Sequence, residues 1–178
     1  MYYDYIILGS GIAGLSLARS LLEYGKKVML LDNRGIGYGA SGAPASLGNP
    51  ATGPKAKLIW RAEACYKALT RQLEIASLAG AKSVFKVSGV LRPGLDRKQA
   101  RKMKEQFDQT SWPAGWAYWL DESEVGNLNS ELACTLGGVW LPAGLTIDTE
   151  AYLYQLYDYL IEKGLAFEVA ARYKLSKS

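Results

Sequence analysis

The sequence predicts an α/β fold, because short apolar runs typical of strands alternate along the chain with amphipathic helical patterns. At the start, the apolar residues 6–8, expected to form a strand buried on both faces, lead into Gly9-x-Gly11-x-x-Gly14 and a helical pattern. A second apolar run, residues 28–31, ends in Asp32. Strand, glycine turn, helix, strand and terminal acid in this order predict a Rossmann-like βαβ unit that binds a dinucleotide.

Each part of this unit has a physical role. Gly9 allows a sharp turn after the strand, and Gly11 leaves room for a pyrophosphate to reach the free N–H groups of the helix start. Gly14 allows the helix to pack closely on the sheet, and Asp32 is placed to accept hydrogen bonds from a ribose hydroxyl. The alternative is a structural βαβ turn without a ligand.

Residues 33–53 are the second informative stretch, because they are small, rich in glycine and serine, and show no apolar period. A nicotinamide-binding domain would normally continue from Asp32 directly into another helix. Backbone of this composition can run close to a ligand and offer N–H and hydroxyl donors to it. A surface loop without function is the alternative, but loops this long in compact domains are usually functional or disordered.

The remaining elements follow from periodicity and capping residues. We expect a long helix over 55–79, a strand over 84–91, a helix capped by Asp96 that ends near Gln109, and a short helix over 121–128. Strands are expected within 112–120, at 138–142 and from Leu165 to Val169, with a helix over 149–163 capped by Asp148. The tryptophans of the 112–120 segment are expected to fill a core rather than to line a ligand site.

Composition excludes several classes of site. The chain has 178 residues, 49% of them hydrophobic and 21% charged, as in a soluble globular protein. It contains no histidine, which excludes a Ser-His-Asp triad, a His-ligated metal and a flavin attached through histidine. No membrane span or leader pattern is present, and Cys65 and Cys134 are expected as buried or half-buried reduced thiols. We therefore expect a cytoplasmic location, no membrane contact and no metal site.

The net charge of +4 is concentrated in one predicted helix, which carries Arg97, Lys98, Arg101, Lys102 and Lys104. A solvated helix face is the interpretation that we favour over a nucleic-acid surface.

The opening residues 4–16 resemble the FAD-dependent D-amino-acid oxidase and glycine oxidase superfamily. Gly39-Ala40-Ser41-Gly42 is similar to a segment that this family has after its second strand. Residues 141–148, with the helix and strand that follow them, resemble the family's return from the substrate domain. Within that superfamily, the stretch from Gly39 through Pro50 and into the predicted long helix is most similar to the FAD domain of the bifunctional tRNA 5-methylaminomethyl-2-thiouridine enzymes. The likeness covers about half of the family's usual length, so a fragment or a shortened member is expected.

The resemblance implies FAD as the cofactor and an FAD-binding domain with a partly present inserted α+β substrate domain. It implies an FAD-binding segment over 1–82, a partial substrate domain over 83–142 and a returning helix and strand over 143–178. By the same resemblance the cofactor-binding residues are Gly9, Ser10, Gly11, Ile12, Ala13, Gly14, Asp32, Asn33, Arg34, Ala40, Ser41, Gly42 and Asn49. Arg34 would lie beside the adenine and Asn49 near the isoalloxazine. No catalytic residue is assigned, because the family's catalytic positions lie mostly beyond Ser178.

The expected function is oxidation of a small-molecule amine or amino acid by hydride transfer to the flavin. Three alternatives stay open: a flavin-dependent tRNA-modification oxidoreductase, a truncated and non-catalytic FAD-binding module, and nicotinamide binding. A chain that ends at Ser178 is also expected to expose strand edges and to self-associate through them.

Overall fold

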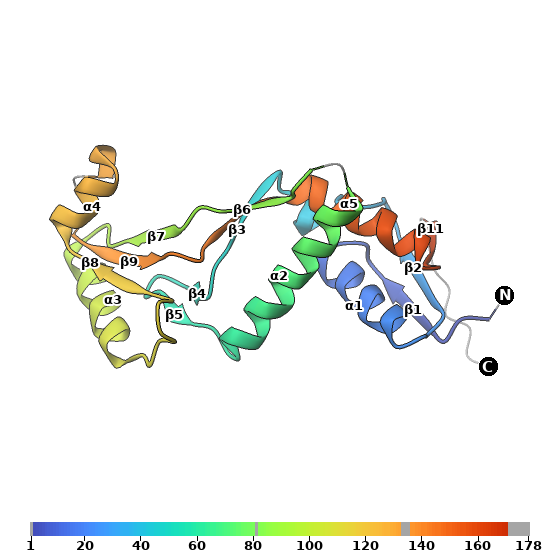
Figure 1. Ribbon diagram of the computed structural model, residues 1–178, viewed down its shortest axis with the longest axis horizontal. Helices are drawn as coiled ribbons and strands as arrows, with labels where there is room; N and C mark the ends of the chain where they lie inside the picture. Colours follow the sequence, from blue (N-terminus) through green and yellow to red (C-terminus); the bar gives the residue numbers. More distant parts are fainter. Residues whose placement is uncertain (1, 81, 133–135, 171–178) are drawn as a thin grey trace. The chain divides into compact units, whose positions relative to one another are not determined.

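The computed structural model describes residues 2–80, 82–132 and 136–170 (Figure 1). Its strands are β1 (Tyr5–Leu8), β2 (Val28–Asp32), β3 (Ala45–Gly48), β4 (Ala51–Thr52), β5 (Lys57–Leu58), β6 (Phe85–Val87), β7 (Val90–Pro93), β8 (Tyr118–Leu120), β9 (Gly138–Leu141), β10 (Leu145–Asp148) and β11 (Ala166–Val169). Its helices are α1 (Ile12–Glu23), α2 (Ala62–Ala79), α3 (Arg97–Gln109), α4 (Glu122–Leu128) and α5 (Thr149–Glu162), with short 3₁₀ turns η1 (Ala40–Gly42) and η2 (Ser130–Leu132).

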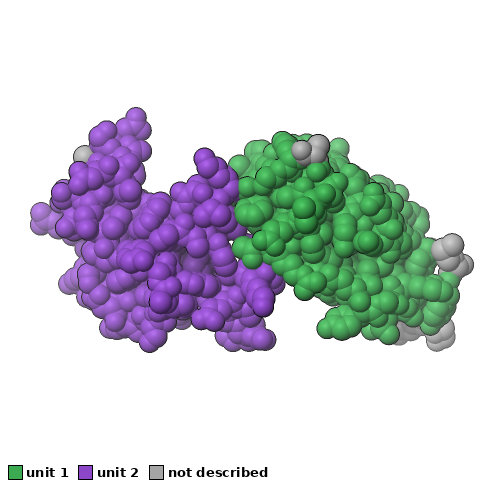
Figure 2. Space-filling view, in the orientation of Figure 1, with its two compact units in different colours: residues 1–46, 70–85, 147–178 green, residues 47–69, 86–146 purple. Residues whose placement is uncertain are grey.

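The chain forms two compact units, coloured separately in Figure 2. Unit 1 comprises residues 1–46, 70–85 and 147–178, and unit 2 comprises 47–69 and 86–146. The functional division into 1–82, 83–142 and 143–178 remains a prediction.

Unit 1 is built on a parallel sheet of order β1-β2-β11. Ile7 pairs with Leu30, and Leu30 pairs on its other side with Phe167. Helices α1 and α5 lie beside this sheet (Figure 1) and bury their apolar stripes, among them Leu15, Leu153 and Leu156. The predicted βαβ unit is confirmed, and the strand predicted from Leu165 to Val169 is confirmed as β11, which pairs parallel to β2.

Strand β1 differs from the prediction in its burial. Ile7 is buried beneath the helices, but Ile6 and Leu8 keep 57% and 58% of their surface exposed. Side chains alternate between the faces of a strand, so Ile7 faces the helices while Ile6 and Leu8 face the opposite side. The prediction of burial on both faces is therefore wrong: the described residues leave this second face open.

Unit 2 contains an antiparallel sheet of order β7-β9-β8, against which α3 packs. Its core includes Met103 of α3 and Val139 and Leu141 of β9. Trp112 and Trp119 pack against this core, as expected for the aromatic segment. A short hairpin pairs Ala51 of β4 with Leu58 of β5.

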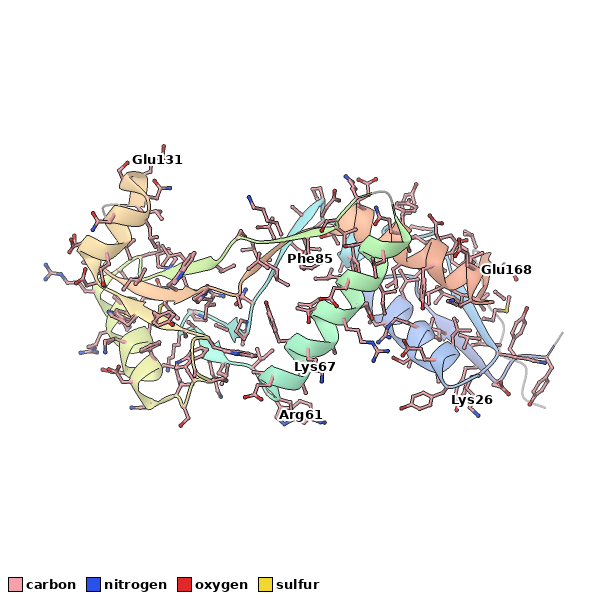
Figure 3. All side chains as sticks on the ribbon, in the orientation of Figure 1. Lys26, Arg61, Lys67, Phe85, Glu131 and Glu168 are labelled. Carbon is pink, nitrogen blue, oxygen red and sulfur yellow. The ribbon has the colours of Figure 1, made fainter. Side chains whose placement is uncertain are left out.

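The predicted helix over 55–79 is too long at its start. Residues 55–61 form strand β5 and a turn, and α2 begins only at Ala62, next to Arg61 (labelled in Figure 3). Ala56 and Arg61 adopt φ angles of 49° and 50°, left-handed conformations that interrupt a helix. Cys65 lies on the exposed side of α2, contrary to the expected burial, and Cys134 lies outside the described residues.

The predicted strand over 84–91 is two strands, because Gly89 turns the chain with a φ of 71° between β6 and β7. Strand β6 instead belongs to a sheet of order β3-β10-β6. The sequence patterns indicated neither β3 nor β10. By contrast, the helix caps were predicted correctly, since the side chains of Asp96 and Asp148 accept hydrogen bonds from Gln99 N and Ala151 N at 2.8 and 3.0 Å.

Among the described residues, no helix has the length and apolar character needed to cross a membrane.

Candidate dinucleotide-binding site

The glycine turn after β1 is shaped by two of its glycines. Gly9 adopts a φ of 103°, and its N–H donates to Leu31 O at 2.7 Å, which ties the turn to β2. A Cβ atom at Gly14 would lie 1.9 Å from Gly9 O and 3.5 Å from a Leu30 methyl. Gly14 therefore allows the first turn of α1 to pack against the backbone of the turn and against the sheet.

The start of α1 presents free backbone donors. Gly11 is its N-cap and supplies no capping side chain, and the first turn carries no acidic residue. Ile12 N donates to Ser41 Oγ at 3.1 Å, whereas Ala13 N and Gly14 N find no acceptor among the described residues. Such a helix start is suited to bind an anionic oxygen.

Ser41 is brought to this helix start from far along the chain by η1. Its Oγ lies 2.8 Å from the position that a Cβ atom at Gly11 would take, so only glycine fits at position 11 without displacing the hydroxyl. The turn itself is tightly folded, since a Cβ at Gly42 would lie 2.0 Å from Gly37 O. Gly42 is thus required by the packing of this loop, which places the Ser41 hydroxyl beside the free amides.

Asp32 joins the glycine turn to the loop that follows β2. Its Oδ2 accepts from Ser10 N at 2.7 Å and from Ser10 Oγ at 2.8 Å. Its Oδ1 accepts from Arg34 N at 2.8 Å and from Gly35 N at 3.0 Å. Partial burial raises the pKa of Asp32, but these four hydrogen bonds outweigh it and lower the pKa to about 2. The carboxylate is therefore ionised at neutral pH.

Unit 1 brings together the predicted residues of the glycine turn, of η1 and of the end of β2. Asn33 and Arg34 lie there with exposed side chains. Asn49 belongs to unit 2, where its Oδ1 accepts from Ala51 N at 3.1 Å, and its place near a cofactor remains a prediction.

Sequence reasoning missed two residues of the site, Gly35 and Gly37. Gly35 donates to Asp32, and the carbonyl of Gly37 lies against Gly42. Their φ angles of 104° and 78° are rarely adopted by other residues, and the closely spaced glycines of this loop were the signal available. Among the described residues, no group of His, Cys, Asp or Glu side chains is arranged to hold a metal ion.

Comparison with known protein families assigns this chain to one of them. The model described as "DAO: FAD dependent oxidoreductase" matches residues 4–171. The chain belongs to the FAD dependent oxidoreductase (DAO) family. The DAO match covers both the glycine turn and the loop that carries Ser41.

Relatives and solved structures agree with this DAO assignment. The chain is 27% identical over 156 residues to the bifunctional protein ThiO/ThiG of Trichormus variabilis, covering 85% of this chain and 23% of that protein. It is 31% identical over 142 residues to the tRNA 5-methylaminomethyl-2-thiouridine biosynthesis bifunctional protein MnmC of Shewanella amazonensis, covering 79% and 21%. Its fold matches glycine oxidase from Geobacillus kaustophilus with a TM-score of 0.77 at 16% identity, covering 94% of this chain and 46% of that one. The chain thus spans less than half of each of these proteins.

The donors of the site fit the pyrophosphate of a dinucleotide. The amides of Ala13 and Gly14 have no acceptor in the part of the chain that the structure describes, and the amide of Ile12 is bound only by the Ser41 hydroxyl. With glycine at position 11 leaving room for close approach, these donors provide what two linked phosphate groups require.

Proposed function

We propose that this chain is the FAD-binding part of an oxidoreductase that oxidises an amine or an amino acid. The observation that carries the proposal is the hydrogen bond from Ile12 N to Ser41 Oγ, next to Gly11. It places a hydroxyl beside the backbone N–H groups at the start of α1 and so forms a candidate anion-binding site. The DAO family match and the likeness to glycine oxidase support FAD and this substrate class. When bound, FAD would supply the redox chemistry by accepting a hydride from the carbon that carries the nitrogen.

The residues of the chain would bind and orient the cofactor. Ile12 N, Ala13 N and Gly14 N would donate to phosphate oxygens, and the Ser41 hydroxyl would turn from accepting to donating. Asp32 would fix the glycine turn through Ser10 and hold the adenosine ribose. Each Asp32 oxygen already accepts two hydrogen bonds, so a ribose hydroxyl would have to replace one of them.

Replacement of Gly11 tests the site. The purified chain is expected to carry FAD, identified by its absorption spectrum and by mass spectrometry of the released cofactor. Gly11→Val would fill the space in front of the amides, so the variant should lose FAD while its circular dichroism spectrum is retained. Gly126→Val is the matched control, because a Cβ there meets open space. A Gly11→Val protein with a full complement of FAD would show that the cofactor binds elsewhere.

A second candidate is a flavin-dependent oxidoreductase that modifies tRNA. The observations that favour it are the MnmC relative and the exposed cationic side chains at the start of α3. Under this alternative the wild-type chain binds tRNA with a steep salt dependence, and Arg101→Glu with Lys102→Glu abolishes binding without changing the flavin content. Unchanged tRNA binding by this double variant would exclude α3 as the RNA surface.

A further inference from the structure

Unit 2 contains a pocket of about 250 Å³ between the β4–β5 connection and the first turns of α3. Its lining residues are Pro54, Lys55, Asp96, Lys98, Gln99 and Lys102. The wall formed by the connection is held in place, since Arg92 donates to Ala51 O at 3.1 Å and to Gly53 O at 2.7 Å. Gln99 Nε2 also donates to Pro54 O at 3.4 Å, which joins the connection to α3.

Three lysines give this pocket an unbalanced positive charge. Lys98 and Lys102 are four residues apart and so lie on the same face of α3, and Lys55 faces them from the connection. None of the three forms an ion pair or a hydrogen bond with a described residue. Two other cations of α3 are paired instead: Arg101 lies 3.7 Å from Glu105, and Lys104 lies 2.5 Å from Asp108. The pocket therefore gathers three cationic side chains that have no ionic partner among the described residues.

One carboxylate also lines the pocket. Asp96 Oδ1 accepts from Gln99 N at 2.8 Å as the cap of α3 and so is partly committed to the helix. Three ammonium groups facing one carboxylate leave a net charge of +2 among the lining side chains.

We propose that Lys55, Lys98 and Lys102 form a phosphate-binding site in unit 2. A phosphate monoester carries a charge of about −1.5 to −2 and three strong acceptor oxygens. Each phosphodiester of a nucleic acid carries one negative charge, and successive phosphates along a strand can meet several ammonium groups. The group could belong to the phosphodiester backbone of an RNA strand or to a small phosphate ester. This inference does not rest on the proposed oxidation, because the pocket lies in unit 2 and the glycine turn in unit 1.

Lysine acetylation followed by mass spectrometry tests the site directly. The chain is treated with an acetylating reagent alone, with inorganic pyrophosphate, or with a 20-nucleotide single-stranded RNA, all at equal ionic strength. We expect at least one probe to slow acetylation of the three pocket lysines several-fold. Lys26, Lys27 and Lys86 are exposed controls outside the pocket (Lys26 is labelled in Figure 3) and should react at an unchanged rate.

The two probes separate the sources of the phosphate. Protection by RNA but not by pyrophosphate assigns the site to a nucleic-acid backbone. Protection by pyrophosphate, with or without protection by RNA, assigns it to a small phosphate ester. If neither probe protects the pocket lysines, or if the control lysines are protected equally, the proposal is wrong.

A matched pair of variants gives a second readout. Replacing Lys55, Lys98 and Lys102 by Gln should weaken binding of the protecting probe about 10-fold or more, since each exposed ionic contact contributes a few-fold. The same change at Lys26, Lys27 and Lys86 alters net charge equally and should have little effect. An equal loss of probe binding in both variants would mean that the probe is attracted by net charge alone, and the proposed site would be wrong. FAD content should be the same in both, so failure here is distinguishable from failure of the proposed oxidoreductase.

Discussion

Gly11 and Gly14 are neighbours on the first turn of α1, but side chains are excluded from them for different reasons. At Gly11 a Cβ atom would meet the hydroxyl of Ser41, which can rotate away. At Gly14 it would meet the backbone carbonyl of Gly9, which can move only if the whole turn shifts. A side chain at position 11 should therefore affect mainly ligand binding, and a side chain at position 14 should affect mainly the stability of the fold.

Alanine at these two positions should separate binding from stability. Gly14→Ala is expected to lower the free energy of unfolding by about 1–3 kcal/mol, the usual cost of overpacking. Gly11→Ala should change it much less and act mainly on FAD affinity. Urea denaturation followed by circular dichroism measures the difference, with Gly126→Ala as the control. Equal stability of the two glycine-turn variants would contradict the packing seen at Gly14.

Asp32 should make stability depend on pH in the acid range. Its pKa is lowered from 3.8 to about 2 in the folded chain, so the folded state favours the ionised form. The stabilisation is complete above the unfolded pKa and is lost as the pH falls from about 4 toward 2. Asp32→Asn should therefore remove part of the acid-induced fall in melting temperature. Parallel curves for wild type and variant between pH 5 and 2 would contradict the hydrogen bonding described for this carboxylate.

Loss of the same carboxylate should weaken FAD. Asp32→Ala removes a charged acceptor, and hydrogen bonds to charged groups contribute about 1.5–3 kcal/mol, so the dissociation constant for FAD should rise accordingly. Fluorescence titration of the flavin-free protein measures it, and Asp4→Ala, outside the predicted site, is a control. An unchanged constant would leave Asp32 with a structural role only.

At the scale of elements, a buried polar network within unit 1 joins α1, α5 and the part of α2 that belongs to this unit. Arg19 of α1 is buried and donates through Nε to Gln72 of α2 at 3.1 Å. Gln72 Nε2 donates to Ser16 Oγ at 2.7 Å and to the hydroxyl of Tyr152 on α5. Burial raises the pKa of Tyr152, which therefore stays protonated at neutral pH. Gln72 is the shared partner that satisfies the other members.

Removing Gln72, the centre of this network, should lower the free energy of unfolding more than removing the hydroxyl of Tyr152 at its edge. Gln72→Ala leaves the Arg19 guanidinium without one buried acceptor, and an unsatisfied buried group costs about 1–3 kcal/mol or more. Tyr152→Phe removes one hydroxyl and should cost about 0.5–1.5 kcal/mol. Urea denaturation of both variants measures which of them loses more stability, with Gln106→Ala in unit 2 as a control. A larger loss for Tyr152→Phe would show that Gln72 is not the centre.

Elements with strong local signals were predictable from the sequence, and elements fixed by distant contacts were not. Asp96 and Asp148 marked helix starts because a cap acts on amides only a few residues away. Strands β4 and β5 have two residues each, and the left-handed backbone at Ala56 and Arg61 leaves no mark in the periodicity. A helix was therefore predicted to begin too early.

The candidate site shows the same contrast. The glycine pattern and Asp32 identify a dinucleotide turn because their spacing is local. The contact of Ser41 with Ile12 depends on the path of a loop, and the resemblance to a family indicated the segment but not the hydrogen bond. The pocket of Lys55 and Lys102 could not be predicted, because its two sides are distant in sequence.

At the scale of the whole molecule, the open face of the β1-β2-β11 sheet should promote self-association. Ile6 and Leu8 are more than half exposed on this face, and among the described residues no strand pairs with the outer edges of β1 and β11. Sedimentation velocity of the 178-residue polypeptide should show concentration-dependent oligomers, and Ile6→Thr with Leu8→Thr should reduce them. Leu78→Thr with Leu95→Thr, which changes exposed leucines away from the sheet, is the control. Monomers at all concentrations would contradict the prediction.

The 178-residue polypeptide alone should oxidise amines slowly or not at all. It spans 46% of the glycine oxidase chain whose fold it matches, so a flavin bound to it is expected to lack part of a preorganised, water-excluding site. Loss of such preorganisation costs about 100-fold or more in rate. Anaerobic mixing with glycine, sarcosine and D-amino acids, followed at the flavin band, measures the rate against Geobacillus kaustophilus glycine oxidase. Bleaching at a comparable rate would show that these 178 residues suffice.

The pairing of β11 with β2 has a consequence for the order in which the protein forms during translation. Strands β1 and β2 leave the ribosome early, but the strand that covers the second edge of β2 is made only after all of unit 2. Until then the nascent chain carries an unprotected apolar edge, and pairing across such a separation is slow because a long loop must close first. Emergence of residues 166–169 from the ribosome is thus the moment at which unit 1 can become resistant to proteases, and chaperone binding to the chain should fall at that point.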